Sequence, residues 1–141
     1  MTFDEAYKAI RRNKLERLRE ALDSGLNPSL ASDKNGLTLL MVTAGDGNTT
    51  IGRLLIERGA DINLKDGHGD SALSMAAMKG HASFISLLLK RGASIENAFP
   101  DNSLETFLNW IEKYCVSPVE RMVKVREAFE APNYWDEKPG E

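Results

Sequence analysis

Apolar and polar positions along this chain follow a pattern that returns after 33 residues. Ile56–Ile62 reads Ile-Glu-Arg-Gly-Ala-Asp-Ile, and Leu89–Ile95 reads Leu-Lys-Arg-Gly-Ala-Ser-Ile. The same shift superposes Leu40 on Leu73. A fixed period of this length is typical of a stack of repeated helical or mixed units. The sequence therefore predicts a repeat architecture.

Each block opens on a short helix. Thr38 and Ser71 each precede an apolar run, and a hydroxyl oxygen at that position accepts a hydrogen bond from an amide of the first helical turn. Glycines follow both runs, at Gly45 and Gly47 in one block and at Gly80 in the next. Glycine permits the tight turn that a helix reversal requires, so a second helix is expected to fold back on the first.

The second helix of each block carries one apolar stripe. Apolar residues recur there at i, i+3 and i+4 with polar residues between them, which is the helical period. The stripe residues are Ile51, Leu54 and Leu55 in one block and Phe84, Leu87 and Leu88 in the next. Gly59 and Gly92 follow where a left-handed C-cap favours glycine. Gly67 and Gly69 then predict a tight, projecting turn.

One such unit cannot cover its own apolar face, so about three or more must stack. Gly25 lies 34 residues before Gly59, which indicates an N-terminal repeat with one extra residue in its turn. Downstream the motif fades into two amphipathic segments, the second starting with Ser117 as N-cap and Pro118 at the first helical position. Their apolar stripes are Leu104, Phe107, Leu108 and Ile111, then Val119, Met122, Val123, Arg126 and Phe129.

These units predict one all-α domain over residues 1–131, a solenoid of about four helix pairs with projecting turn fingers. Its units are 1–32, 33–65, 66–98 and a diverged C-terminal pair over 99–131. Residues 132–141 lack a helical period and are expected to form a flexible acidic and aromatic tail. At 141 residues, one domain is also the expectation from length.

Four short motifs resemble the ankyrin-repeat family. Gly36–Leu40 and Gly69–Leu73 resemble its Gly-x-Thr-Pro-Leu opening, and Gly80-His81 and Gly59–Asn63 resemble its Gly-His and Gly-Ala-Asp-Val-Asn motifs. The match is strong in two repeats, moderate in the first and nearly absent in the last. The resemblance implies a stack of helix pairs whose concave face and fingers bind other proteins.

The sequence departs from the family pattern at two positions of each full repeat. Leu39 and Ala72 replace the family's proline, and Met41 and Ser74 replace the histidine that ties neighbouring repeats together in the family. We expect these departures to make the array less stable than a consensus one.

Charge and apolar content exclude several classes of partner. The net charge is −3, and it sums to +1 over residues 1–32, to 0 over 33–98 and to −4 over 99–141. No basic patch emerges, so no nucleic-acid partner is expected. No apolar stretch approaches the roughly 20 residues of a membrane span, and no secretory signal opens the chain. The sequence predicts a cytoplasmic protein without a membrane contact.

Candidate chemistry is sparse. His68 and His81 have no cysteine or glutamate at metal-ligand spacing. Residues 44–50 are rich in glycine but lack the Gly-Lys-Ser/Thr ending of a phosphate-binding loop, and Asp61–Gly67 places Lys65 where a calcium loop needs an oxygen. Cys115 cannot form an internal disulfide and is expected to pack as a small apolar residue on a helix face. The sequence therefore predicts no enzyme, no metal site and no cofactor.

The function predicted from these patterns is protein binding. A small stand-alone array suits an inhibitor, an immunity-type antidote to a toxin, or a regulatory subunit, and we expect it to be a monomer alone. The predicted partner-binding residues occupy finger tips and the ends of first helices. They are Arg11, Arg12, Lys34, Asn35, Leu37, Asp46, Lys65, His68, Asp70, Met78, Lys79 and Asp101. Leu37 and Met78 stand out because apolar side chains facing water often anchor interfaces, the alternative being that they pack against a neighbouring finger.

Two other functions remain open at this stage. An enzyme or small-ligand binder could use the diverged C-terminal region, where Trp110, Tyr114 and Glu112 could line a pocket. Such a site requires a concave cavity with perturbed carboxylates. A homo-oligomer formed through the C-terminal helices is the third reading.

Overall fold

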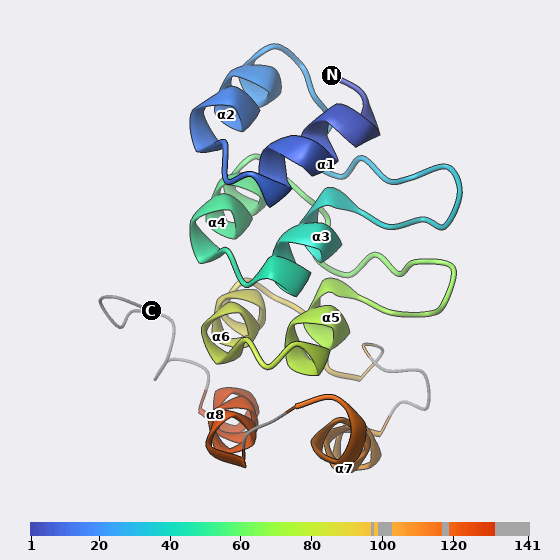
Figure 1. Ribbon diagram of the computed structural model, residues 1–141, viewed down its shortest axis with the longest axis vertical. Helices are drawn as coiled ribbons and strands as arrows, with labels where there is room; N and C mark the ends of the chain where they lie inside the picture. The colour runs from blue at the N-terminus through green and yellow to red at the C-terminus, as the bar shows by residue number, and fades with distance from the viewer. Residues whose placement is uncertain (97, 99–102, 117–118, 132–141) are drawn as a thin grey trace.

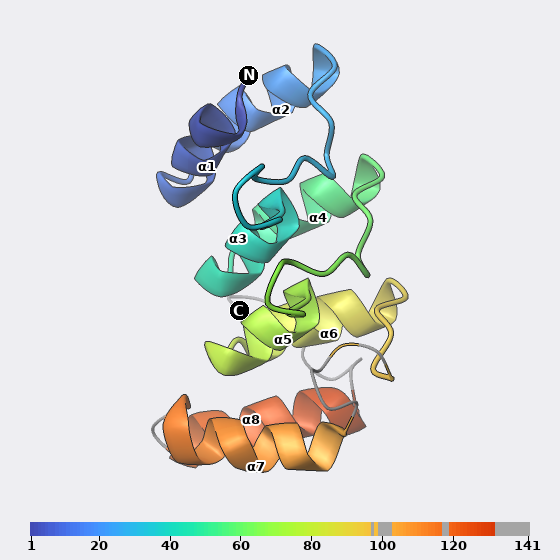
Figure 2. The same ribbon diagram turned by 90° about the vertical axis from the view of Figure 1, so that its right-hand side faces the viewer.

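A computed structural model describes residues 1–96, 98, 103–116 and 119–131, and within them every regular element is a helix. The helices form four consecutive pairs stacked along the long axis of the molecule, as Figure 1 and Figure 2 show. The helices are α1 (Phe3–Arg11), α2 (Leu15–Asp23), α3 (Leu39–Asp46), α4 (Thr49–Glu57), α5 (Ala72–Met78), α6 (Ala82–Lys90), α7 (Leu104–Tyr114) and α8 (Val119–Glu130). The all-α solenoid predicted from the repeat is confirmed.

The first helices α1, α3, α5 and α7 lie on one side of the stack and the second helices on the other (Figure 1). Two fingers project on the side of the first helices, one before α3 and one before α5. A single antiparallel bridge between Ala31 and Thr38 closes the base of the first finger. We call the surface made by α1, α3, α5, α7 and the two fingers the inner-helix face.

Hydroxyl caps start the first helices as predicted. Thr38 Oγ1 accepts from the Met41 amide at 3.1 Å, and Ser71 Oγ accepts from the Ser74 amide at 3.2 Å. In return the Ser71 amide donates to Ser74 Oγ at 2.8 Å, and the Thr38 amide lies 3.5 Å from Met41 Sδ. Met41 and Ser74, which stand where the family has histidine, therefore complete the caps of their own helices.

Glycine ends the helices at most of the predicted positions. Gly47, Gly59 and Gly92 have φ values of +71°, +95° and +99°, a region that glycine enters without strain. Gly45 differs from its prediction as a turn residue, because α3 continues through it to Asp46 and only Gly47 takes the left-handed conformation.

The core runs the length of the stack because each pair buries its apolar stripe against the next. Ile51, Leu55, Phe84 and Leu88 are all 0% exposed. Packing is closest where α4 meets α6, because Gly52 offers no side chain there: a Cβ on Gly52 would lie 2.7 Å from ring atoms of Phe84. Neighbouring repeats therefore fit together through residues that differ in size between repeats.

The C-terminal pair closes the core. Phe107, Leu108 and Ile111 of α7 are buried as predicted, but Val123 of α8 is 48% exposed, which corrects its place in the predicted stripe. Val125 is buried in its stead at 0%. The predicted N-cap and first turn of α8, at residues 117–118, lie outside the described residues.

Hydrogen bonds join each repeat to the next at the ends of the second helices. The amide of Asp61 donates to Ser29 Oγ at 2.8 Å, and the amide of Ser94 donates to Asn63 Oδ1 at 2.8 Å. The two bonds span 32 and 31 residues of sequence, about one repeat period. They give the stack a regular set of ties between nearest neighbours.

Candidate partner-binding face

The first finger presents two of the predicted residues at its tip. Lys34 and Asn35 are exposed. The Asn35 side-chain oxygen accepts from the Leu37 amide at 3.0 Å, which fixes the turn in the way short polar side chains do. The Asn35 carbonyl accepts from the Gly67 amide at 2.8 Å. The two fingers are thus tied together close to their tips.

The second finger is organised by an aspartate that the sequence analysis passed over. Asp66 Oδ1 accepts from the amides of His68 and Asp70, at 2.9 and 3.0 Å. This arrangement leaves Lys65 and His68 exposed. Lys34, Asn35, Lys65 and His68 therefore form one row along the fingers, which we call the finger row.

Asp70 lies at the base of the second finger rather than at its tip. Ser74 Oγ donates to Asp70 Oδ1 at 3.1 Å. Partial burial raises the pKa of the Asp70 carboxyl and the nearby Asp66 charge raises it further, while the hydrogen bond from Ser74 lowers it. The contacts place Asp70 at the start of α5, where it helps to hold the finger against the helix.

A second row lies at the opposite ends of the first helices. Arg11 Nε lies 3.4 Å from Asp46 Oδ1, so α1 and α3 are joined by an ion pair. Arg11 also donates to the Tyr7 hydroxyl at 3.4 Å. Arg11, Asp46, Met78 and Lys79 form this helix-end row. Helices of 7 to 9 residues separate it from the finger row by roughly 10–14 Å at about 1.5 Å per residue.

Two predicted residues do not join either row. Arg12 lines a groove between α1 and α2 with Lys8 and Arg17, at the N-terminal end of the stack. Asp101 lies outside the described residues.

Leu37 and Met78 are half-buried and pack against the core. Part of each side chain remains exposed on the inner-helix face. The structure thus combines the two readings of these residues, since each contributes to packing and to the accessible surface.

The C-terminal end of the inner-helix face carries exposed aromatic rings. Trp110 is 47% exposed and Tyr114 is 65% exposed. Their ring centroids lie 6.0 Å apart, and Trp110 lies 6.3 Å from the buried ring of Phe107. Lys113 Nζ lies 5.2 Å from the Tyr114 centroid. The i, i+4 spacing of Trp110 and Tyr114 in the sequence already placed both rings on one helix flank.

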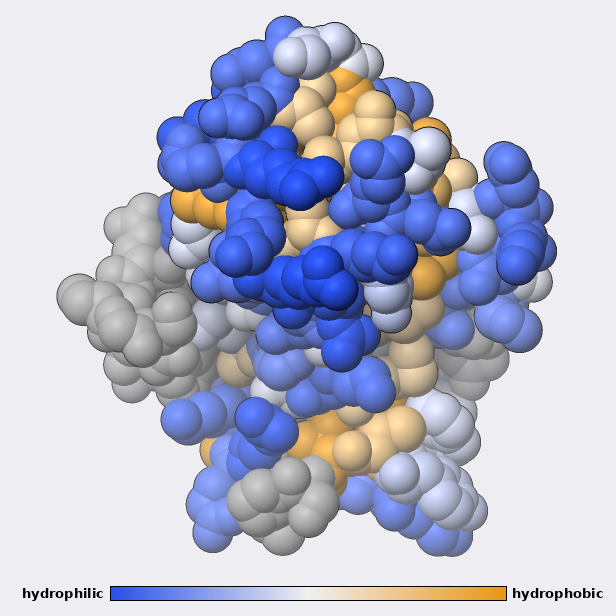
Figure 3. Space-filling model, turned by 45° about the horizontal axis from the view of Figure 1, so that its top comes forward, coloured by the Kyte–Doolittle hydropathy of each residue, from blue (hydrophilic) through white to orange (hydrophobic). Residues whose placement is uncertain are grey.

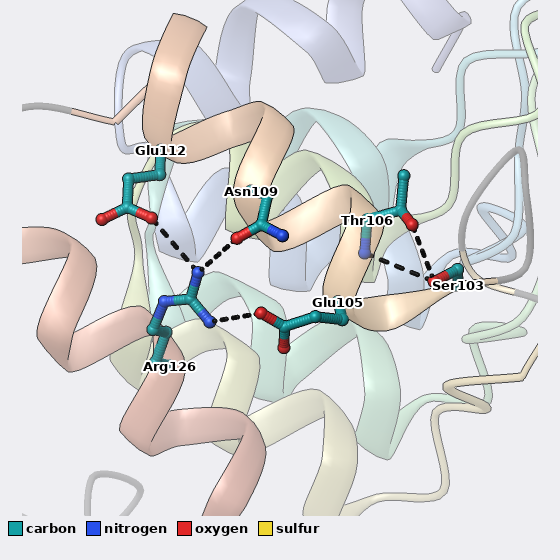
Figure 4. A network of polar contacts seen from close by, with 6 residues as sticks. All are labelled: Ser103, Glu105, Thr106, Asn109, Glu112 and Arg126. Atoms are coloured by element: carbon teal, nitrogen blue, oxygen red, sulfur yellow. Dashed lines mark hydrogen bonds and ion pairs between the residues drawn. The ribbon is translucent and has the colours of Figure 1, made fainter.

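The C-terminal pocket considered from the sequence does not assemble around these rings. Glu112 is two positions from both Trp110 and Tyr114, a rotation of about 200° that places it on the other flank of α7. Figure 4 shows the Glu112 carboxylate directed to Arg126 of α8, at 3.2 Å. Arg126 also donates to Asn109 at 3.1 Å. Glu112 is therefore part of a contact between α7 and α8.

Arg126 joins the two helices of the C-terminal pair. Its guanidinium lies 3.4 Å from Glu105 Oε1 in addition to its contacts with Asn109 and Glu112 (Figure 4). The sequence analysis placed Arg126 in the apolar stripe of α8, and the structure assigns it three polar partners on α7 instead. An arginine has five N–H donors in a planar fork, so one side chain can bind several acceptors.

The two histidines have different surroundings. His68 is exposed on the second finger. His81 is half-buried, with Nε2 3.1 Å from the Gly45 carbonyl and its ring against Gly47. Burial lowers the pKa of His81 and the positive charge of Arg121 lowers it further, against the raising effect of the Gly45 carbonyl.

Cys115 corrects another expectation. It lies at the end of α7 and is exposed instead of packed as an apolar residue. Partial desolvation raises the pKa of its thiol, so its surroundings do not favour a reactive thiolate.

Two searches of the described residues complete the inventory. They contain no group of three histidine, cysteine, aspartate or glutamate side chains placed to hold a metal ion. Within the same part of the chain, no helix has the length and apolar character needed to cross a membrane.

Comparison with known proteins identifies the repeat. Residues 6–98 match the family model for ankyrin repeats (3 copies), which is well over half of the 141 residues. The match ends before α7 begins.

Several curated proteins share this region. The ankyrin repeat and KH domain-containing protein mask of Drosophila melanogaster is 48% identical over 65 residues, 45% of this chain and 2% of that protein. The photoreceptor ankyrin repeat protein of Homo sapiens is 40% identical over 86 residues, 59% of this chain and 19% of that protein. Inversin of Danio rerio is 35% identical over 66 residues, 45% of this chain and 6% of that protein.

The chain therefore spans only a small part of the length of these relatives. Ankyrin repeats generally bind proteins and generally lack catalytic activity. The period, the stacked helix pairs, the fingers and the family match agree, and the chain belongs to the ankyrin-repeat family.

Proposed function

We propose that this chain is a non-enzymatic module that binds one partner protein through the inner-helix face and acts as an inhibitor, an immunity-type antidote or a regulatory subunit. The observation that carries the proposal is the exposure of Trp110 and Tyr114 on the same face as the finger and helix-end rows. Binding energy in protein interfaces concentrates in a few residues, and Trp, Tyr and Arg are over-represented among them.

The inner-helix face has the composition of such an interface. Its aromatic end can supply the apolar centre that an interface needs, and the charged finger and helix-end rows can supply the polar rim. A standard interface covers about 800 Å² of each partner. That area is roughly a tenth of the 7545 Å² of accessible surface of this chain, so one face of the stack suffices.

Inhibition is the role that suits these features best. A stack held by nearest-neighbour ties presents a preorganised surface, and preorganisation reduces the entropy lost on binding. Such a surface can cover the active site of another protein without chemistry of its own. The same face also suits a regulatory subunit, which differs from an inhibitor only in the effect that binding has on the partner.

Affinity capture with a matched set of variants tests the proposal. The partner is first identified by capture on the wild-type chain, and its dissociation constant is then measured with purified components. Trp110→Ala/Tyr114→Ala is expected to weaken binding by 30-fold or more, since removing an anchor residue costs about 2 kcal/mol or more. Val123→Ala is the control, because Val123 is an exposed apolar residue of α8, outside the inner-helix face.

An unchanged dissociation constant in the double aromatic variant would refute the assignment of the face. Circular dichroism confirms that each variant keeps its helices. Light scattering on the chain alone is expected to give the mass of a monomer, and a dimer mass lost in Trp110→Ala/Tyr114→Ala would assign the same rings to self-association instead.

A further inference from the structure

A basic groove lies at the N-terminal end of the stack, away from the inner-helix face. It is a cavity of about 360 Å³ between α1 and α2. Its lining residues are Glu5, Lys8, Ala9, Arg12, Lys14 and Arg17. Figure 3, which brings this end of the molecule forward, shows hydrophilic side chains over most of it with a few apolar residues between them. Four cations and one carboxylate thus share one hollow.

The four cations have no ion-pair partner within the described part of the chain. Other arginines nearby are paired: Arg11 with Asp46 at 3.4 Å, and Arg19 with Glu16 at 3.6 Å. The carboxylate of the groove is also engaged elsewhere, because Glu5 Oε1 accepts from the Thr2 amide at 3.2 Å.

This capping contact lowers the pKa of Glu5, so the carboxyl stays ionised but is bound to the start of α1. The positive charges of Lys8, Arg12, Lys14 and Arg17 are therefore left largely uncompensated.

The groove occupies a place that is apolar in the interior repeats. Shifted by one period, Lys8 corresponds to Val42, and Arg17 corresponds to Ile51. Val42 and Ile51 are 7% and 0% exposed, because the preceding repeat covers them. Terminal repeats of solenoids carry a polar outer surface for solubility, which accounts for the polarity of the groove.

Solubility does not account for the sign of the charges. Surfaces are most favourable when both signs are interspersed, and like charges in one hollow repel one another. The chain as a whole has a net charge of −3, so acidic side chains are more common in it than basic ones. A cluster of four cations on such a chain indicates selection for an anionic ligand.

We propose that this groove binds an acidic segment of the partner protein, through carboxylates that pair with Lys8, Arg12, Lys14 and Arg17. The inference rests on the proposed protein-binding function and adds a second contact region to it. Arginine binds carboxylates through two parallel hydrogen bonds, which gives such a contact geometry as well as charge. The sequence analysis found no basic patch because acidic residues are interspersed among these cations along the chain, and only the fold brings the four together.

An acidic protein segment fits the groove better than a nucleic acid does. Proteins that bind DNA commonly make about 6–10 phosphate contacts along an extended surface, whereas this groove offers four cations in 360 Å³. That volume is near the lower end of ordinary ligand pockets, about 300–1,000 Å³. It accommodates a few side chains rather than a continuous strand.

A titration followed by NMR tests the proposal without knowledge of the partner. The probe is a hepta-glutamate peptide added to the nitrogen-15-labelled full chain at low ionic strength, where exposed charges are least screened. The expected result is a saturable shift of the amide signals of residues 8–17. The shifts should be lost as salt is raised.

Two double variants with the same change of charge decide where the peptide binds. Lys8→Glu/Lys14→Glu is expected to weaken peptide binding at least tenfold. Lys34→Glu/Lys65→Glu, on the fingers, is the control and is expected to change it less than twofold. All four lysines are exposed, so neither variant disturbs the core. Equal weakening in both variants would show an effect of net charge alone and overturn the proposal.

Two further arms identify the ligand. Inorganic phosphate and a 20-nucleotide single-stranded DNA replace the peptide in the same titration. The proposal requires the peptide to bind more tightly than either, and it is overturned if the DNA or phosphate binds more tightly or if the peptide produces no shifts. Trp110→Ala/Tyr114→Ala is expected to bind the peptide as the wild type does, so failure of the inner-helix face and failure of the groove are separate results.

Discussion

Phe84 of α6 lies in the space that a side chain on Gly52 of α4 would occupy. A Cβ on Gly52 would come within 2.7 Å of two ring atoms of Phe84, and Phe84 is fully buried. One repeat therefore accepts the largest side chain of the next because a glycine faces it. The interface between these repeats is specific in shape, and this allows a direct test.

Gly52→Ala is expected to lower the free energy of unfolding. Alanine favours a helix over glycine by about 1 kcal/mol, but overpacking a well-filled core costs about 1–3 kcal/mol. The buried ring of Phe84 cannot move aside, so the clash should outweigh the helix preference. Urea unfolding followed by circular dichroism measures the difference.

Gly45→Ala is the matched control for this test. Gly45 lies in α3, and a Cβ there meets no atom within 4 Å. The same substitution should therefore stabilise the chain by up to about 1 kcal/mol. A stable Gly52→Ala would show that the contact with Phe84 is looser than described.

Arg126→Gln is expected to loosen the C-terminal pair. Arg126 contacts Glu105, Asn109 and Glu112 on α7, while 28% of its side chain remains exposed. Exposed ion pairs contribute about 0.2–1 kcal/mol each, so we expect a total loss of about 1 kcal/mol that shrinks at high salt. Thermal unfolding at two salt concentrations measures it.

Arg19→Gln controls for the loss of one arginine charge. Arg19 makes one pair, with Glu16 in the same helix, and its replacement is expected to change stability by less than about 0.5 kcal/mol. Equal effects of the two substitutions would argue against a network role for Arg126.

Protonation of His81 is expected to destabilise the fold. Burial, chiefly, and the neighbouring charge of Arg121 lower the pKa of His81 below its usual 6.5 in the folded chain. The unfolded chain then takes up a proton at a higher pH than the folded chain does. The contribution of His81 to stability is therefore complete above about pH 7 and is lost as pH falls below about 6.5 and through the folded pKa.

The difference between wild type and His81→Gln isolates this effect from other titrating groups. Wild type should be more stable at pH 7.5, and its advantage should shrink as the pH is lowered toward 5. Each unit by which the pKa is lowered corresponds to about 1.4 kcal/mol. His68→Gln should leave the pH dependence of the wild type in place, and a constant advantage across the range would contradict the assignment to His81.

The charged and aromatic parts of the inner-helix face are expected to affect different rate constants for the partner. Peripheral charges mainly steer association, whereas buried anchors mainly set dissociation. Against an acidic partner, Lys34→Glu/Lys65→Glu should slow association severalfold at low salt. Trp110→Ala/Tyr114→Ala should instead speed dissociation. Surface plasmon resonance resolves the two rates, and a reversed pattern would move the anchor to the fingers.

The sequence predicted the elements of the fold because their determinants are local and repeated. Thr38 and Ser71 cap their helices as their positions before apolar runs indicated. Gly59 and Gly92 take the left-handed conformation expected after a second helix. These features depend on a few neighbouring residues, and a period of 33 residues presents each of them twice.

Features that depend on tertiary packing could not be predicted in the same way. Val123 and Val125 lie on different sides of one helix, and only the contact of α8 with α6 buries Val125 and leaves Val123 exposed. Arg126 has its partners on another helix, about 20 residues away in sequence at Glu105. The basic groove likewise arises only when α1 and α2 pair.

The ties between neighbouring repeats have a consequence for the bound protein. Asp61 bonds to Ser29 and Ser94 bonds to Asn63, so each repeat is held by the one beside it and the free chain can lose its terminal pairs first. A partner that touches both the basic groove and Trp110 would bridge the whole stack from end to end. The complex would then melt in a single step and resist proteases along its full length, as a row of books does once both bookends are in place.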